Sequence, residues 1–229
     1  MKPYENTTAM YRAIDPGKDQ SYVLAVLNEE QLKGAIFPLG DTVKDDVRIE
    51  AKKRGLYVAN KPDSHDICFI PSGNNAGWLR DRLGSEVGPI VDEEGNQVGE
   101  HQGAYTYTIG QRRGLNLSIP AADGNPRYVL KIEPKSNTVV VGSKEALAIS
   151  KIEGEKAIWC GPQPEHGKSY RGFAQVRAHG APLACDYVTD GSHIIATLDQ
   201  PLLGLATGQG LVIYDGDRVV GSATVSATE

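Results

Sequence analysis

Residues 210–224 read GLVIYDGDRVVGSAT. Two β-branched runs at 210–214 and 218–224 flank Asp215-Gly216-Asp217, a pattern that predicts two antiparallel strands joined by a tight turn. Four further runs of this kind precede them, at residues 157–159, 172–177, 183–188 and 194–198. Six short strands in this length predict a small closed β-barrel over residues 151–229.

A second β region covers residues 76–150. Short runs at 90–91 and 97–98 flank a turn at 93–96, and runs at 128–132 and 138–141 flank a hairpin turn at 134–137. Residues 105–109 alternate with the period of a strand, and residues 145–147 indicate one turn of helix. The sequence therefore predicts a central β domain here.

Helical signals dominate residues 1–75. A short helix is predicted within residues 20–27, and Asn28 and Gln31 form a capping-box pattern for another. Thr42 is expected to cap a helix over residues 43–54, which Gly55 ends in a left-handed conformation. A strand is predicted at residues 56–58. The predicted fold class is mainly β, with a helical N-terminal segment and two small β domains, the last a six-stranded barrel.

The composition indicates a globular chain in the cytoplasm. Of 229 residues, 40% are hydrophobic, which suffices for one sizeable core or two to three small ones. No apolar run approaches the roughly 20 residues needed to span a bilayer, and no signal-peptide core follows Met1, so no membrane association is expected. The net charge of -5 argues against nonspecific nucleic-acid binding but permits a local basic patch.

Three cysteines, Cys68, Cys160 and Cys185, lie far apart and form neither a zinc motif nor a disulfide framework. In an extended segment, Cys68 faces away from Ile67 and Phe69, which can anchor in the core. Lys61 and His65 would favour its thiolate, whereas Asp63 and Asp66 would oppose it. Two interpretations remain open for Cys68: a reactive thiol in a cleft, or a buried structural cysteine.

Two polar stretches are candidate binding segments. Lys18, Asp19 and Gln20 combine a cation with groups that can bond base edges or riboses, although the same residues suit an ordinary capped helix. Arg112 and Arg113 form a cationic spot suited to phosphate, or else a solvated turn. Nearby His101 is a candidate general base or ligand, or a hydrogen-bonding partner of a neighbouring strand or loop.

Taken together, these stretches resemble the tRNA-specific 2-thiouridylase family. The resemblance runs from about Tyr11 to Val225, and the ordered series of motifs carries it. The matching segments are Lys18-Asp19-Gln20-Ser21-Tyr22, Phe37-Pro38-Leu39-Gly40, Asp63-Ser64 with Ile67-Cys68-Phe69-Ile70, Gly99-Glu100-His101-Gln102-Gly103, Tyr107-Thr108-Ile109-Gly110-Gln111-Arg112 with Gly114-Leu115, Tyr128-Val129, Gly208-Gln209 and Tyr214-Asp215-Gly216.

The sequence lacks the SGGxDS pyrophosphate loop with which family members begin. By the resemblance, that loop, a GHY segment and a first catalytic cysteine lie upstream, and residues 1–75 are the remnant of an α/β nucleotide-binding domain. ATP with Mg²⁺ is then a cofactor of the full-length enzyme, and this chain alone is expected to be inactive.

The resemblance also implies a reaction. In the family, ATP adenylates the C2 oxygen of the wobble uridine of tRNA, and a persulfide sulfur then replaces that oxygen. Cys68 matches the persulfide-carrying cysteine, and the upstream cysteine attacks the persulfide or resolves it as a disulfide. The implied partners are the anticodon region of tRNA and, as persulfide donor, a sulfur-relay protein or cysteine desulfurase.

Six residues match tRNA contacts of the family. Lys18, Asp19 and Gln20 match one segment; Arg177, Ala178 and Gln209 match contacts on the C-terminal barrel. Ala178 stands where the family often has tyrosine, so the resemblance does not carry over an aromatic contact there.

Two other functions compete with that of a 2-thiouridylase. An RNA-binding module without chemistry would not need the Cys68 segment. A cysteine-dependent hydrolase pairing Cys68 with a histidine would be expected to carry a nucleophile-elbow or protease signature, which this sequence lacks.

Overall fold

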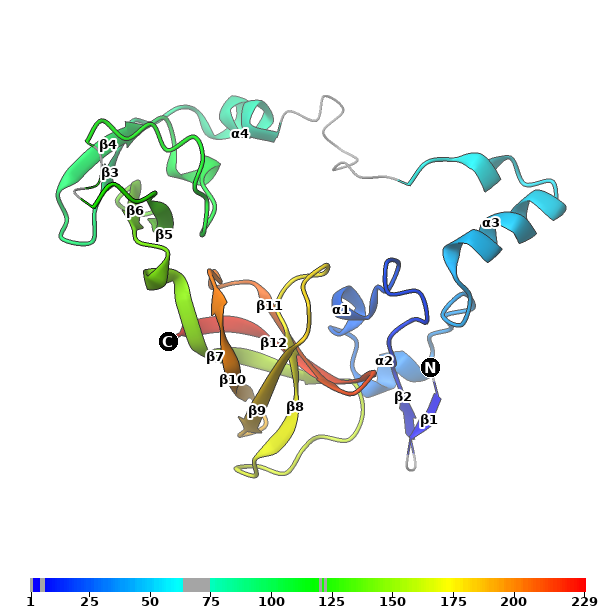
Figure 1. Ribbon diagram of the computed structural model, residues 1–229. Helices are drawn as coiled ribbons and strands as arrows, with labels where there is room; N and C mark the ends of the chain where they lie inside the picture. The colour runs from blue at the N-terminus through cyan, green and yellow to red at the C-terminus, as the bar shows by residue number, and fades with distance from the viewer. Residues whose placement is uncertain (1, 5–6, 64–74, 120, 122) are drawn as a thin grey trace. The chain divides into compact units, whose positions relative to one another are not determined.

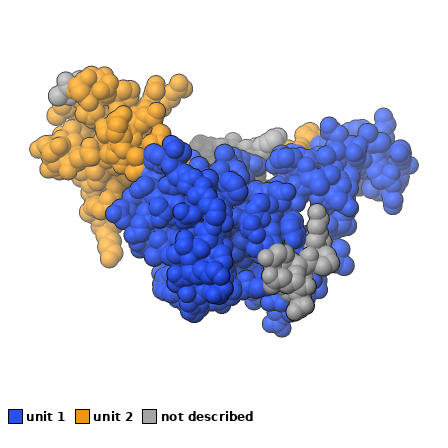
Figure 2. All heavy atoms as spheres, turned by 60° about the horizontal axis from the view of Figure 1, so that its bottom comes forward, with its two compact units in different colours: residues 1–61, 149–201, 206–229 blue, residues 62–148, 202–205 orange. Residues whose placement is uncertain are grey.

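A computed structural model describes residues 2–4, 7–63, 75–119, 121 and 123–229. The chain forms two compact units (Figure 2). The first unit contains residues 1–61, 149–201 and 206–229, and the second contains residues 62–148 and 202–205. The first 61 residues thus share a unit with the barrel, whereas the sequence predicts three separate domains over residues 1–75, 76–150 and 151–229.

The first unit is built on a closed, six-stranded antiparallel barrel (Figure 1). This confirms the predicted barrel, and several strands extend beyond their predicted ends. Around the barrel the order is β10-β7-β12-β11-β8-β9. The strands are β7 (Ala148–Trp159), β8 (Tyr170–Gln175), β9 (Leu183–Thr189), β10 (His193–Leu203), β11 (Gly210–Asp215) and β12 (Arg218–Thr228).

The N-terminal segment is attached to the barrel by backbone pairing. A hairpin of β1 (Lys2–Tyr4) and β2 (Thr7–Ala9), which the sequence analysis did not predict, leads into it. The N–H of Val219 donates to the carbonyl of Met10 at 2.9 Å, and the N–H of Arg12 donates to the carbonyl of Asp217 at 2.8 Å. Residues 10–12 therefore continue alongside β12.

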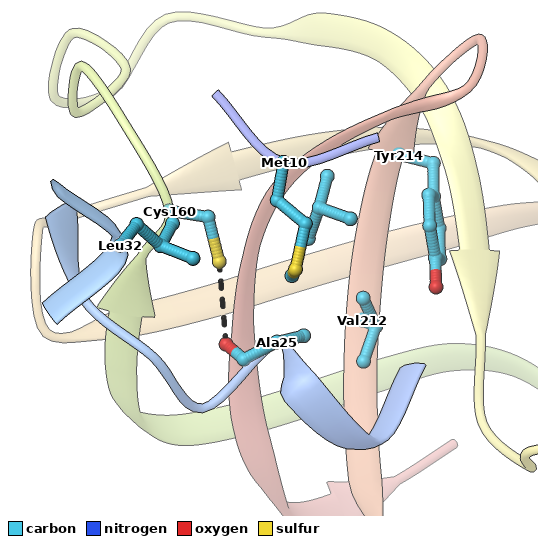
Figure 3. Packing of buried hydrophobic residues seen from close by; sticks show 7 residues of the cluster. Met10, Ala25, Leu32, Cys160, Val212 and Tyr214 are labelled. Carbon is cyan, nitrogen blue, oxygen red and sulfur yellow. Dashed lines mark hydrogen bonds between the residues drawn. The ribbon is translucent and has the colours of Figure 1, made fainter. Parts of the chain in front are cut away.

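Two short helices, α1 (Ser21–Leu24) and α2 (Glu29–Lys33), bury apolar side chains against one side of this barrel. Burying one such side chain contributes about 1.5–3 kcal/mol. The Cys160 thiol lies among them and donates to the carbonyl of Ala25 at 3.4 Å (Figure 3). The buried cluster consists of Met10, Ala25, Leu32, Cys160, Val212, Tyr214 and Val219.

The predicted capping box of α2 is present: the Gln31 N–H donates to Asn28 Oδ1 at 2.9 Å, and the Asn28 N–H donates to Gln31 Oε1 at 3.0 Å. The next helix, α3 (Lys44–Lys53), begins without the predicted Thr42 cap. Instead, Asp15 accepts from the first helical N–H, that of Lys44, at 2.9 Å.

Helix α3 buries none of its residues. Large apolar side chains before, within and after it are exposed, up to 95% for Tyr57. This apolar surface comprises Ile36, Leu39, Val43, Ile49, Leu56, Tyr57 and Val58. Within the described ranges, no helix combines the length and the apolar character that crossing a membrane requires.

The second unit contains α4 (Asn75–Leu83) and a four-stranded sheet of order β4-β3-β6-β5. Both predicted strand pairs are confirmed, and β3 and β6 pair in parallel between them. Its buried apolar side chains are Ile90, Ala104, Leu115, Val129, Val139 and Val141. The strands are β3 (Gly88–Val91), β4 (Gln97–His101), β5 (Tyr128–Glu133) and β6 (Thr138–Gly142).

Two strand predictions were wrong. Residues 56–58 lead into a 3₁₀ helix at Tyr57–Asn60, and residues 105–109 overlap another at Ala104–Thr106. The second turn is fixed at Gly103, whose φ of 148° is open mainly to glycine and whose carbonyl accepts from Thr106 Oγ1 at 2.7 Å. A third 3₁₀ turn, Glu145–Leu147, agrees with the predicted helical turn.

His101, at the end of β4, is buried and serves the local backbone. Its Nδ1 accepts from the N–H of Gly103 at 3.0 Å. Burial lowers the pKa of His101, and the nearby backbone carbonyl of Asn137 opposes this effect only partly. The geometry agrees with the interpretation of His101 as a hydrogen-bonding residue of this loop.

Acid should destabilise the second unit through His101. A histidine whose pKa is lowered by folding contributes its full stability at pH values above its unfolded-state pKa of about 6.5. That contribution is lost as the pH falls from there through the lower folded-state pKa. His101→Asn, which keeps an acceptor near Nδ1, should flatten the pH dependence of unfolding between about pH 7.5 and about pH 5. Urea titration followed by Trp78 emission in a Trp159→Phe background measures this. The exposed His166→Asn is the matched control, and an unchanged profile for His101→Asn would refute the assignment.

Candidate nucleic-acid interface

Asp19 is the centre of a polar site in the first unit. Its Oδ1 accepts from the N–H groups of Ala13 at 3.0 Å and Ser21 at 3.1 Å. Its Oδ2 accepts from Ser21 Oγ at 2.7 Å and lies 3.4 Å from Nη1 of Arg12. The Asp19 side chain is 9% exposed. The carboxylate thus points inward and holds the segment in shape, while its neighbours Lys18 and Gln20 are exposed.

Arg12 connects this segment to the barrel. Its guanidinium lies 3.6 Å from the centre of the Tyr214 ring, and its Nη2 donates to Gln175 Oε1 at 2.7 Å. Gln175 is buried, and its Nε2 donates to the carbonyls of Arg177 at 2.9 Å and Ala178 at 3.2 Å. One hydrogen-bonded chain therefore joins the Lys18–Gln20 segment to the Arg177–Ala178 segment.

A second contact joins the N-terminal segment to the barrel at Gly210, next to Gln209. The hydroxyl of Tyr22 donates to the carbonyl of Gly210 at 3.0 Å. Burial raises the pKa of Tyr22, and the positive charge of Arg177 opposes that rise, so Arg177 lies near this side of the site. Oε1 of Gln209 is buried and has no hydrogen-bond partner within the described part of the chain. A buried acceptor of this kind costs free energy until a donor reaches it.

The structure thus gathers all six candidate tRNA contacts in one unit. Lys18, Gln20, Arg177 and Ala178 are exposed, Gln209 is partly buried, and the Asp19 carboxylate points inward. Arg112 and Arg113 are exposed as well, but they belong to the second unit.

The sequence analysis missed the residues that hold the site together. Ser21, Tyr22 and Tyr214 were in the quoted motifs, so their place there was a signal that could have marked them. Nothing in the sequence marked Arg12 and Gln175, because their pairing joins positions separated by 163 residues.

The candidate catalytic residue Cys68 lies outside the described residues. The other two cysteines are buried free thiols. Burial raises the pKa of Cys160 to about 12 and that of Cys185 to about 11, so both thiols are protonated at neutral pH.

Two described cavities do not fit ATP. One, of about 530 Å³, is lined by the carboxylates of Asp19 and Asp217. The other, of about 740 Å³, is lined by Glu29 and Glu30. Arg12 in the first cavity is paired with Asp19, and Lys33 in the second is paired with Glu29, so neither cavity offers a triphosphate an uncompensated Lys or Arg charge.

Three family models match consecutive parts of the chain. They are the tRNA methyl transferase HUP domain over residues 2–72, the tRNA methyl transferase PRC-barrel domain over residues 76–143, and the aminomethyltransferase beta-barrel domain over residues 149–225.

Relatives specify the family further. The chain is 52% identical over 228 residues to a tRNA-specific 2-thiouridylase of Cutibacterium acnes, covering 100% of this chain and 62% of the relative. It is 54% identical to that of Streptomyces coelicolor (96% and 58%) and 55% identical to that of Thermobifida fusca (95% and 59%). The chain belongs to the tRNA-specific 2-thiouridylase family, and it spans about three fifths of the length of these relatives.

Proposed function

We propose that this chain supplies the sulfur-carrying and tRNA-docking portion of a tRNA 2-thiouridylase, a transferase that replaces the C2 oxygen of the wobble uridine with sulfur. The relatives that it matches are named tRNA-specific 2-thiouridylases. In this proposal the ATP-dependent activation of the uridine belongs to parts of the whole protein outside this chain.

One observation carries the docking half of the proposal. Asp19, Arg12 and Gln175 form a continuous chain of polar contacts that ends on the carbonyls of Arg177 and Ala178. Two exposed cationic segments, far apart in sequence, are thereby held on one unit. Exposed Lys and Arg side chains on a fixed frame can bind successive phosphates, and the Gln209 amide could bond a ribose hydroxyl after a rotation that exposes its buried Oε1.

The sulfur half rests on Cys68. Its thiolate would take the sulfane sulfur of a donor persulfide, which leaves the donor as a thiolate and Cys68 as a persulfide. The donor would be a sulfur-relay protein or a cysteine desulfurase. We assign no step to ATP on this chain.

The alternative, an RNA-binding module without chemistry, shares the docking surface and differs only at Cys68. Sulfur loading of Cys68 therefore separates the two, whereas RNA binding does not.

RNA binding should depend on Lys18 and Arg177. Alanine at either position should weaken the binding of every tRNA and lower the slope of log affinity against log salt by about 0.7–0.9, the share of one phosphate contact. Fluorescence anisotropy of a labelled tRNA, from about 50 to about 200 mM salt, measures both changes.

The matched control is Lys156→Ala, a barrel lysine that is 80% exposed and lies outside the hydrogen-bonded site. An equal loss for Lys156→Ala would mean that any surface cation serves. No detectable binding by the unsubstituted chain at low salt would overturn the docking proposal.

A further inference from the structure

A cavity of about 530 Å³ opens beside the candidate tRNA contacts in the first unit. Its volume lies within the range of about 300 to about 1,000 Å³ that is typical of small-molecule pockets. Phe173 and Gln175 of β8 line it together with Arg12 and Asp19 of the N-terminal segment and Ala178 of the β8–β9 connection. Lys18 and Arg177 are chain neighbours of two of these residues.

Phe173 presents an aromatic ring inside this cavity. It alternates with buried Gly172 and Ala174, so its ring lies on the outer face of the barrel. It pairs directly with Tyr214 of β11, yet the two rings differ: Tyr214 is fully buried under Arg12, whereas Phe173 is 41% exposed. Because β8 is hydrogen-bonded to β9 on one side and β11 on the other, this ring sits on a rigid support.

The charges around the cavity select its occupant. Asp19, Asp217 and His179 line it, and the one guanidinium that lines it, that of Arg12, is already paired with Asp19, Gln175 and the Tyr214 ring, so two carboxylates face this space with no uncompensated Arg or Lys charge. A phosphate is therefore disfavoured inside. A neutral, flat group with hydrogen-bonding edges suits it, and Ala178 contributes only a methyl group to the lining.

We propose that this cavity receives one unpaired nucleobase of the docked RNA, stacked on the ring of Phe173. This rests on the proposed docking function and adds a base site to it. Phosphates on either side of that base would meet Lys18 and Arg177, while the base edge would face Asp217. Stacking on an aromatic ring is tolerant of sequence, so this site would contribute affinity without choosing among bases.

The test measures anisotropy with a labelled, unmodified tRNA and four variants of the full chain. Phe173→Ala and Phe173→Leu should weaken binding roughly five- to one-hundred-fold without changing the salt slope, because a ring is lost and no charge. Phe173→Trp keeps an aromatic ring and should bind RNA as tightly as the unsubstituted chain does. RNA should also quench the tryptophan emission of this variant more than that of the unsubstituted chain. Leu203→Ala removes a side chain of similar exposure (43%) at the end of β10, where the chain belongs to the second unit, and this variant should bind as the unsubstituted chain does.

Failure of this proposal is distinct from failure of the docking function. If Lys18→Ala and Arg177→Ala weaken binding but Phe173→Ala and Phe173→Leu do not, the RNA docks and the base site is wrong. If Phe173→Leu retains affinity where Phe173→Ala loses it, binding needs only an apolar side chain at this position, and stacking is refuted. Such a result would fit an apolar contact with a protein partner instead. If the unsubstituted chain binds no RNA, both proposals fall.

Discussion

Incubation of the chain with a low-molecular-weight persulfide should add one sulfur atom at Cys68 and none at Cys160 or Cys185. Burial raises the pKa of Cys160 to about 12 and that of Cys185 to about 11, so neither supplies a thiolate at neutral pH. Intact-mass measurement followed by peptide mapping checks the site. Cys68→Ser should abolish the gain entirely, the largest effect expected of any substitution in this chain.

The matched control for that experiment is Cys185→Ser, which removes a thiol of the barrel and should leave sulfur loading unchanged. Loading that survives in Cys68→Ser would place the reactive thiol elsewhere. No loading of the folded, unsubstituted chain would favour the RNA-binding module over the sulfurtransferase.

Asp19→Ala should cost about 2–4 kcal/mol of unfolding free energy, because it strips partners from two backbone N–H groups and from Arg12 at a site with little access to water. Urea unfolding of the first unit measures the loss. Affinity for tRNA should fall with it, since the Lys18 segment loses its internal support.

Two variants separate support from direct contact. Asp19→Asn keeps one carbonyl oxygen and should lose less stability than alanine. Lys18→Ala, at the exposed neighbouring position, should weaken RNA binding while leaving stability nearly unchanged. A fall in RNA affinity for Asp19→Ala with unaltered stability would show that Asp19 touches the RNA, contrary to its inward orientation.

Local patterns were sufficient to predict the regular elements. Residues 210–224 pair as predicted across the turn at Gly216, and the reciprocal bonds of Asn28 and Gln31 start α2 as the capping box requires. In both cases the interacting residues are neighbours in the chain, so the sequence contains the whole interaction.

The features that the sequence analysis did not predict involve partners that are distant in the sequence. Residues 105–109 alternate like a strand, but the segment begins with a 3₁₀ turn at Ala104–Thr106, where the N–H of Ala104 donates to Asn137 Oδ1 at 3.2 Å across 33 residues of sequence. The inward orientation of Asp19 depends on Arg12 and, through it, on Gln175. Contacts between distant segments decide these features, and propensity does not register them.

The attachment of residues 10–12 to β12 has a consequence for synthesis on the ribosome. Arg12 reaches its partners on Gln175 and Asp217 only after those residues have left the exit tunnel. Chains grow at about 5–20 residues per second, so many seconds pass between the synthesis of the N-terminal segment and that of the barrel strands that bind it. A nascent chain therefore displays Lys18 long before it can present the assembled surface, so the docking site that we propose exists only in the completed chain.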